Sequence, residues 1–273
     1  MGHLMGRARL IMIGMLAVLA LAVPVVALAS TSTVSVSAGL VKVGHPPKLH
    51  LRIMVNGHRG YDQAVRATLC GDLCITTPVT PAANPIRVLD LQSNGTLQVI
   101  LGLYSGGAHC CFIDEVFVRR AHTDTYVQAA QQNFLDAGAR LQTLGGHWSF
   151  VSADARIAED SFTDFADSGS PLQIWRFRSG RFVDVTRSYP SRVARDAAQW
   201  LRAFNHHIAN GVGFIAAWAA DEDLLGHGAR VRSTLASEAR RGRLHSALGL
   251  PHNSQTAFVA ALLKQLRRLG YPH

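Results

Sequence analysis

The sequence predicts an α+β protein, in which an antiparallel β domain precedes a helical domain. Between residues 48 and 185, short runs rich in β-branched and aromatic residues alternate with turn dipeptides such as Asn56-Gly57. After Tyr189-Pro190 the apolar residues recur at helical spacing instead. Strands first and helices second are typical of the α+β class. We therefore expect a β domain over 30–187, built as propeller-like blades or as a sandwich, and a helical domain over 188–273.

The first 29 residues have the three parts of a secretory signal peptide. Arg7 and Arg9 supply the positive start, residues 10–26 are uncharged and largely apolar, and Ala27-Leu28-Ala29 forms an A-x-A cleavage site. Cleavage after Ala29 makes Ser30 the first mature residue and predicts a secreted or otherwise extracytoplasmic protein. An uncleaved anchor is the alternative, because about twenty apolar residues suffice to span a bilayer. The small residues of the cleavage site favour removal.

Nine segments are predicted as strands from their β-branched and aromatic content and their flanking turns: 49–55, 63–69, 86–91, 96–104, 112–119, 126–130, 148–152, 172–177 and 181–185. The clearest hairpin joins the last two through Ser179-Gly180. Residues 30–37 are expected to form a loosely held start. Residues 124–129 resemble 180–185, which suits either a repeated propeller blade or two unrelated hairpins.

Four helices are predicted over 191–205, 212–225, 229–240 and 254–269. Pro190 lies in the first turn of the first helix, and we expect Ser188 to cap it. Asn253 or Ser254 is expected to cap the last helix, which Gly270 ends.

The positive charge of the chain is concentrated in its helical part. The formal net charge is +9, and residues 188–273 hold 11 basic against 5 acidic groups. Arg-rich C-terminal helices suit an anionic envelope polymer or a membrane surface as partner, although a generally Arg-rich genome is the simpler explanation. No aromatic residues alternate with these arginines to stack bases, so nucleic acid is not expected as a partner.

Four cysteines make an even set, Cys70, Cys74, Cys110 and Cys111, and two disulfides are the default in an oxidising compartment. Their spacing fits no common zinc pattern. Geometry disfavours a bond between adjacent cysteines, because their Cα atoms lie only about 3.8 Å apart across a trans peptide. Against this, residues 70–74 form a turn sequence whose ends can meet, which favours a bond between Cys70 and Cys74 and leaves Cys110 to pair with Cys111. The pairing is open on these grounds.

The string Tyr104-Ser-Gly-Gly-Ala-His109-Cys-Cys is the most unusual in the chain. Its glycines permit close backbone approach, and Tyr104 and His109 are candidate binding residues. A Cys–His nucleophile is the catalytic alternative. We favour structural disulfides, because export oxidises such a thiol.

A stretch beginning at Asp90 is similar to a calcium loop of the D-x-D-x-D-G kind. Asp90 and Asn94 fit that pattern, but Gln92 and Gln98 stand where carboxylates are expected. With one anionic ligand, tight binding is not expected. We therefore predict no cofactor, with calcium at Asp90 and Asn94 as the alternative.

Five acids gather within 14 residues: Asp154, Glu159, Asp160, Asp164 and Asp167. A pair of carboxyls is what glycoside hydrolysis requires, whereas such runs more often form solvated loops paired with nearby cations, here Arg156, Arg176 and Arg178. We predict no catalytic residue, and keep Asp154, Glu159, Asp160 and Asp164 as the catalytic alternative. For Asp221-Glu222-Asp223, at a helix C-terminus that disfavours anions, we expect Arg partners.

Residues 88–111, VLDLQSNGTLQVILGLYSGGAHCC, resemble secreted bacterial proteins with FG-GAP or VCBS repeats, a largely uncharacterised group. Further strings at 150–154, 171–177, 180–190 and 216–226 resemble the same group, so the likeness covers most of the chain from Cys70 onward. The resemblance implies propeller blades with calcium loops used in adhesion, and it carries no reaction or ligand. It also implies local pairing, Cys70–Cys74 with Cys110–Cys111.

The predicted function is an exported, non-catalytic binding or structural module of the cell envelope or extracellular space. A secreted, glycosidase-like hydrolase that uses the carboxylates of residues 154–167 is the alternative.

Overall fold

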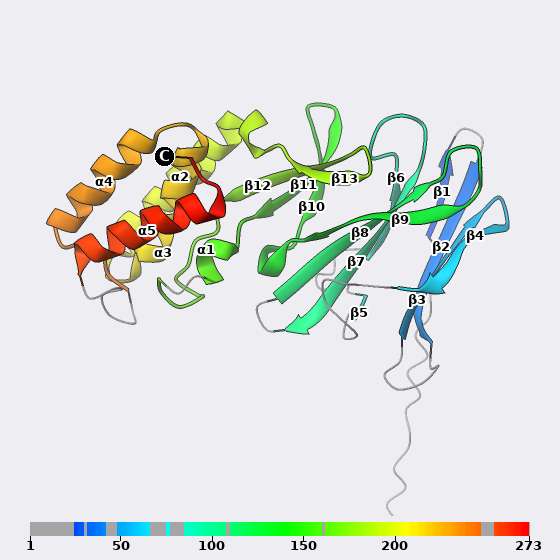
Figure 1. Ribbon diagram of the computed structural model, residues 1–273, viewed down its shortest axis with the longest axis horizontal. Coiled ribbons are helices and arrows are strands. Elements are labelled where there is room, and N and C mark those ends of the chain that lie inside the picture. The colour runs from blue at the N-terminus through cyan, green and yellow to red at the C-terminus, as the bar shows by residue number, and fades with distance from the viewer. Residues whose placement is uncertain are drawn as a thin grey trace, which may run out of the picture.

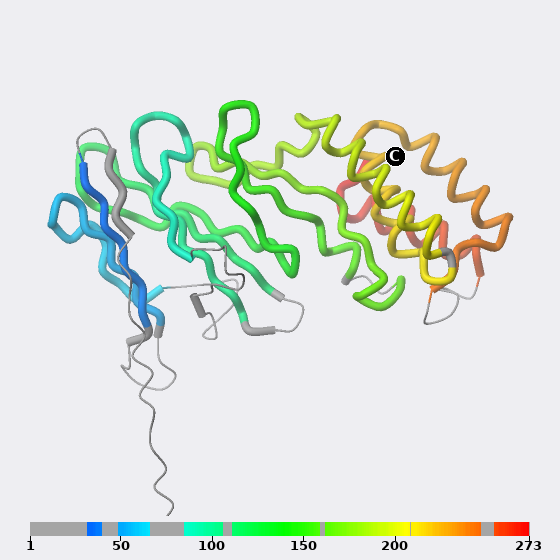
Figure 2. The backbone as a smooth tube through the Cα atoms, turned by 180° about the vertical axis from the view of Figure 1, so that it is seen from behind, coloured from blue at the N-terminus to red at the C-terminus, as the bar shows by residue number. Residues whose placement is uncertain are grey.

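In the computed structural model the protein is an elongated row of three antiparallel sheets followed by a group of helices (Figure 1). Seen from behind, the chain runs from the N-terminal strands at one end to the helices at the other (Figure 2). The structure describes residues 25–29, 32–41, 48–65, 75–76, 85–107, 110–159, 162–246 and 254–272. The predicted α+β class is confirmed, with the sheets before the helices.

The first sheet is a four-stranded meander in chain order: β1 (Val25–Ala29), β2 (Ser32–Val41), β3 (Lys48–Val55) and β4 (His58–Ala64). The alternate residues of β3 from Leu49 to Val55 are buried, because one face of the sheet packs on the core. Asn56 and Gly57 have φ values of 51° and 80°, which is the conformation that a two-residue hairpin turn requires.

Two expectations for this sheet are wrong. Within the segment 30–37 that was expected to be a loose start, the described residues 32–37 belong to β2, which pairs with both β1 and β3, and Val34 and Val36 are each 1% exposed. The partner of β3 begins at His58 rather than at residue 63, because the tight turn brings the chain straight back.

Residues 1–24, most of the predicted signal peptide, lie outside the described residues. Cleavage after Ala29 would remove β1 and leave β2 as the edge strand.

The second sheet is buried on both faces. In it β5 (Ile75–Thr76) and β6 (Ile86–Leu89) pair with successive parts of β7 (Gln98–Gly107), which is followed by β8 (Cys110–Arg119) and β9 (Tyr126–Asn133). The consecutive residues Val99, Ile100 and Leu101 are all 0% exposed. Val99 and Leu101 belong to the core shared with the first sheet, and Ile100 to the core shared with the third.

The third sheet is again a meander, of β10 (Arg140–Leu144), β11 (His147–Ala153), β12 (Leu172–Arg178) and β13 (Arg181–Asp184). The predicted hairpin is confirmed, with Ser179 and Gly180 at φ values of 48° and 77°. Strand β10 was not predicted. Only Leu144 in it is buried, so its sequence lacks a clear alternation.

The three sheets stack face to face through two apolar cores, as the layers of a sandwich or the blades of a propeller do. The similar segments 124–129 and 180–185 fall at the last strands of the second and third sheets. Residues 124–129 include the first part of β9, and residues 180–185 include all of β13. The sequence repeat therefore corresponds to the last strand of the five-stranded second sheet and of the four-stranded third sheet. Three described units are fewer than a closed propeller ring contains.

The helical part contains η3 (Thr186–Ser188), α2 (Pro190–His206), η4 (Ile208–Asn210), α3 (Val212–Leu224), α4 (Gly228–Arg240) and α5 (Gln255–Leu269). Helix α3 lies at its centre, where Trp218 is 1% exposed. Two residues from between β11 and β12 also join this core: Ile157 of α1 (Arg156–Glu159) and Phe162. Gly213 permits this approach, because a Cβ there would lie 2.3 Å from the Asp167 carbonyl oxygen.

The four predicted helices are confirmed, with one difference in capping. Ser254 caps α5, since its hydroxyl accepts a hydrogen bond from the Ala257 amide, and Gly270 ends the helix at a φ of 90°. Ser188 does not cap α2, because it belongs to η3 and Tyr189 occupies the cap position without a side-chain bond.

The three acids at the end of α3 are buried, and Glu222 has the expected Arg partner. Its carboxylate lies 2.9 Å from Arg230 and 2.7 Å from His227. Asp221 instead faces Asp196 of α2. Burial, with the nearby Asp196 carboxylate as a second cause, raises the pKa of Asp221 to about 10.

Replacing Asp221 by Asn is expected to flatten the pH dependence of stability. In the unfolded chain Asp221 ionises near its ordinary pKa of 3.8, whereas in the fold it keeps its proton up to a pKa of about 10. Between these values rising pH favours unfolding, by up to about 1.4 kcal/mol per pH unit. Urea unfolding at pH 5 and pH 8 should show a smaller loss for Asp221→Asn than for the natural protein. Equal losses would contradict this, and Asp136→Asn is the control.

Candidate functional site: a polar cleft between the third sheet and the helices

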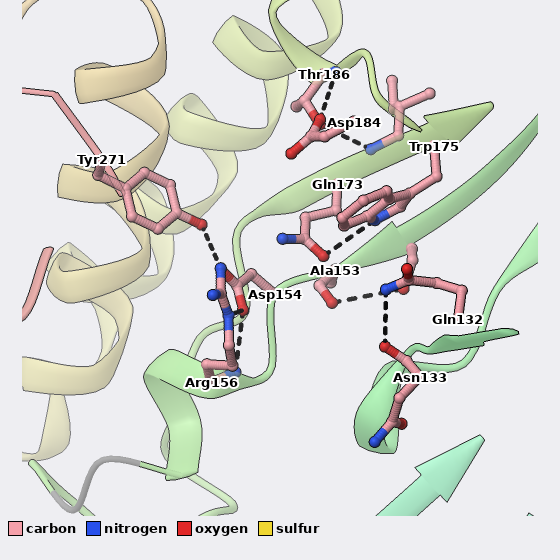
Figure 3. A network of polar contacts seen from close by, with 12 residues as sticks. Gln132, Asn133, Ala153, Asp154, Arg156, Gln173, Trp175, Asp184, Thr186 and Tyr271 are labelled. Carbon is pink, nitrogen blue, oxygen red and sulfur yellow. Dashed lines mark hydrogen bonds and ion pairs between the residues drawn. The ribbon is translucent and has the colours of Figure 1, made fainter. Parts of the chain in front are cut away.

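Two adjoining cavities of about 360 and 240 Å³ lie where the third sheet meets the helices. Both are lined by Arg156, Gln173 and Asp184, and we call them together the junction cleft. Figure 3 shows Tyr271 on the helical side of the cleft and Trp175 on the sheet side. The lining therefore comes from segments that are far apart in the sequence.

The centre of the cleft is a buried carboxylate that holds an arginine. Asp154 directly follows β11 and is 1% exposed. One of its oxygens accepts a 2.7 Å hydrogen bond from Nε of Arg156, and the other accepts one from a terminal nitrogen of the same guanidinium at 2.5 Å. This hydrogen bonding raises the pKa of Arg156. Because the Arg156 side chain is 44% exposed, it remains accessible from the cleft.

Tyr271 completes this arrangement from the helical side. Its hydroxyl donates a 2.8 Å hydrogen bond to Oδ2 of Asp154, across a sequence separation of 117 residues. Burial, together with the Asp154 charge, raises the pKa of Tyr271 well above its ordinary value, so the hydroxyl keeps its proton and stays a donor. Both oxygen atoms of Asp154 are thus engaged, and the carboxylate orients Arg156.

On the sheet side, hydrogen bonds orient the polar side chains of Gln173, Asp184 and Thr186. Oε1 of Gln173 accepts a 3.3 Å hydrogen bond from the Trp175 indole, which leaves the amide NH2 group of Gln173 available. Oδ1 of Asp184 accepts from the backbone and the hydroxyl of Thr186, at 2.8 and 2.5 Å. The Thr186 hydroxyl in turn accepts from the Ile174 amide. These contacts position donors and acceptors without using all of them.

The smaller cavity is also lined by side-chain amides. Gln132 and Asn133, at the end of β9, line it beside Trp175. The Gln132 amide donates to the Asn133 carbonyl at 3.1 Å, and the Asn133 side-chain oxygen accepts from the Leu135 amide at 2.8 Å. Amide groups, a hydroxyl, an indole and balanced charges suit a ligand rich in hydroxyl groups more than an ion. No group of three or more metal-ligating side chains exists within the described residues.

The structure does not gather the predicted carboxylates into one site. Asp154 lies in the junction cleft, whereas the Asp164 carboxylate accepts a 2.9 Å hydrogen bond from the Asp167 amide in the segment that packs on α3. The Glu159 side chain and Asp160 lie outside the described residues.

Of the three arginines expected to pair with these acids, only Arg156 has an acidic partner among the described ion pairs. Arg176 instead donates to the Tyr189 hydroxyl and the Leu144 carbonyl, and Arg178 is exposed.

Sequence reasoning missed most of the junction cleft. Gln173 and Trp175 alternate along β12, which was a usable signal that they share a face. Nothing local pointed to Tyr271, which lies near the end of the chain.

The predicted binding residues near the cysteines are not in the cleft. Tyr104 stacks on Phe112 with ring centroids 4.8 Å apart, and His109 lies outside the described residues. Cys111 is buried and disulfide-bonded. Cys70, Cys74 and the side chain of Cys110 lie outside the described part of the chain, so the pairing stays a prediction.

The loop after Asp90 is closed by its own hydrogen bonds. The Asp90 carboxylate accepts from the amides of Asn94 and Gly95, at 3.1 and 2.7 Å. Gln98, 1% exposed, spans the base of the loop, with Oε1 accepting from the Leu91 amide and Nε2 donating to the Thr96 carbonyl. The Asp90 carboxylate and the Gln98 amide therefore bond within the loop itself and hold its shape.

Calcium is accordingly expected to add almost no stability. Only Asp90 is anionic among the loop side chains, and ligand charge sets affinity. Thermal melts with millimolar calcium and with a chelator should coincide. A rise of several degrees that Asp90→Ala abolishes would contradict this account of the loop.

No family model matches the chain, and no solved structure matches it. The chain is similar to a protein of Synechocystis sp. named "probable thylakoid lumen protein", with 26% identity over 184 residues. That similarity covers 62% of this chain and 54% of the relative, so the chain matches about half of the relative's length. None of the helices in the described ranges has the length and apolar character that a membrane span requires.

Proposed function

We propose that this protein is an extracytoplasmic, non-catalytic binding protein whose junction cleft holds a neutral, polyhydroxylated ligand such as a segment of a glycan. The observation that carries the proposal is a set of polar side chains in the cleft, centred on Arg156 and Gln173. Contacts within the protein hold these side chains in place, but some of their hydrogen-bond donors remain unused. The export-type N-terminus, with cleavage after Ala29, supports the location. The name of the Synechocystis relative is compatible with it.

The balance of charge in the cleft favours a neutral ligand. Two cations, Arg156 and Arg187, line it together with two anions, Asp154 and Asp184. The ligand therefore gains little from a net charge, and its recognition depends on hydrogen bonds. Hydroxyl groups suit this lining because each one both donates and accepts.

The side chains of the cleft combine hydrogen-bonding groups with one aromatic surface. The amide of Gln173 and the guanidinium of Arg156 supply donors, and Asp184 supplies an acceptor beside them. Trp175 adds apolar area next to these groups, and its own indole N–H is already satisfied. A small number of placed polar groups next to an aromatic ring is typical of small-molecule sites.

Binding is favoured over hydrolysis because both oxygens of the central carboxylate, Asp154, already accept hydrogen bonds within the protein. Glycoside hydrolysis requires two carboxyls that act on one bond, one of them as an acid. Both oxygens of Asp154 are occupied by Arg156 and Tyr271, and Asp184 bonds Thr186. In the hydrolase alternative the central carboxyl would have to give up these contacts before it could act on a substrate.

The proposal predicts that a neutral oligosaccharide binds and that Gln173 contributes to its affinity. Isothermal titration with cellohexaose, chitohexaose and mannohexaose should give saturable binding of at least one. Gln173→Ala removes the free amide donor and should weaken that binding about tenfold, or about 1.4 kcal/mol.

The matched control is Gln142→Ala on β10, which changes the same residue type outside the cleft and should bind as the natural protein does. Absence of binding to all three sugars, or equal effects of the two variants, would contradict the proposal. Release of new reducing ends during incubation would support the hydrolase alternative instead.

A further inference from the structure

On one exposed face of α2, a row of arginines lines a shallow groove. Arg192, Arg195 and Arg202 line this groove, of about 570 Å³, together with Asp196 and Gln199. The spacing of the three arginines, i, i+3 and i+10, places them along one side of the helix. At 1.5 Å per residue the row extends about 15 Å. We call this the α2 arginine face.

The arginines of this face have no ion pair or side-chain hydrogen bond within the described part of the chain. On α4 and the turn after it, Arg230 pairs with Glu222, and Arg241 and Arg243 pair with Glu238. Arg232, Arg240 and Arg267 on α4 and α5 likewise form no ion pair among the described residues, so the α2 arginine face differs from them in lining a groove with three charges on one side of one helix. Three unneutralised guanidinium groups on one helix repel one another unless an anion lies between them.

The one carboxylate in the groove, Asp196, offsets one of the three formal charges and forms no ion pair with the arginines within the described part of the chain, so the groove keeps a formal excess of two positive charges. Oδ2 of Asp196 accepts hydrogen bonds from the Leu172 amide and the Trp200 indole, each at 3.0 Å. These contacts hold the carboxylate toward the third sheet and the helix's own Trp200, so it fixes the position of α2.

We propose that the α2 arginine face binds a linear polyanion that carries phosphate groups. A guanidinium matches a phosphate with two parallel hydrogen bonds, and a row of three can engage successive groups of one extended chain. The groove gives such a chain a concave path. This surface adjoins the junction cleft at Leu172, but none of its three arginines lines the cleft.

A membrane surface fits the same face less well. Helices that lie in a bilayer interface bury an exposed apolar side in the lipid. The apolar side of α2, with Val193, Ala197 and Phe204, is already buried within the protein. The groove contributes only Leu172 and Ala198 as apolar lining. Charge without an insertable apolar surface favours a soluble polymer.

The test uses the full chain, inorganic polyphosphate of defined length and a triple variant, Arg192→Gln, Arg195→Gln and Arg202→Gln. The matched control, Arg232→Gln, Arg240→Gln and Arg267→Gln, removes the same charge from exposed positions on α4 and α5 that form no ion pair among the described residues. We expect the first variant to weaken polyphosphate binding at least tenfold, and the control to change it less than threefold. Unfolding curves check that both variants fold.

Three outcomes would overturn the proposal. Equal losses in the two variants would show that net charge alone attracts the polymer. Tighter binding to polygalacturonate than to polyphosphate would exclude a preference for phosphate. Tighter binding to vesicles of anionic phospholipid than to polyphosphate, lost in the first variant, would assign the face to a membrane. Unchanged cellohexaose, chitohexaose or mannohexaose binding in the first variant is expected in every case, because none of the three substituted arginines lines the cleft.

Discussion

The buried carboxylate of Asp154 is the interaction on which the junction cleft depends. It follows the last residue of β11, it holds the Arg156 guanidinium, and it accepts the Tyr271 hydroxyl from beyond the last helix. A charge that is 1% exposed is costly unless it is paired and hydrogen-bonded, and here both conditions hold. The same contacts therefore stabilise the anion, orient the arginine and join the third sheet to the end of the chain.

The stacking of the sheets explains why the cleft lies where it does. The second sheet has its two faces buried between the first and the third, so it offers no open face to a ligand. The third sheet has one face on the second, and its strands β11 and β12 lead to the helical core through α1 and Phe162. The boundary between a sheet core and a helix core leaves room that side chains do not fill, and polar groups from both sides line it. A ligand site at such a boundary is common.

Local patterns were enough to predict most of the fold. Asn56-Gly57 and Ser179-Gly180 fixed two hairpins because their backbone conformations demand such residues, and Ser254 and Gly270 marked the ends of α5. Strand β10 was missed because an edge strand with one buried residue has no alternation to detect. The role of Ser32 and its neighbours in β2 was missed because Ser and Thr are common in loops as well as in strands.

The candidate site was much harder to predict, because its contacts join distant parts of the chain. Asp154 was noticed as one acid among several, but its partner Tyr271 is 117 residues away. Likewise the pairing of Asp221 with Asp196 depends on how α2 and α3 pack. At Gln98 the sequence revealed only a missing calcium ligand, whereas the structure gives the amide a role in closing the loop.

The most direct test of this account is a double-mutant cycle between Asp154 and Tyr271. Asp154→Asn, Tyr271→Phe and the double variant would be compared with the natural protein by urea unfolding. If the hydroxyl–carboxylate contact joins sheet and helices, the coupling free energy should be about 2 kcal/mol, as expected for a buried hydrogen bond to a charged group. A coupling below about 0.5 kcal/mol, within the error of independent sites, would contradict the account.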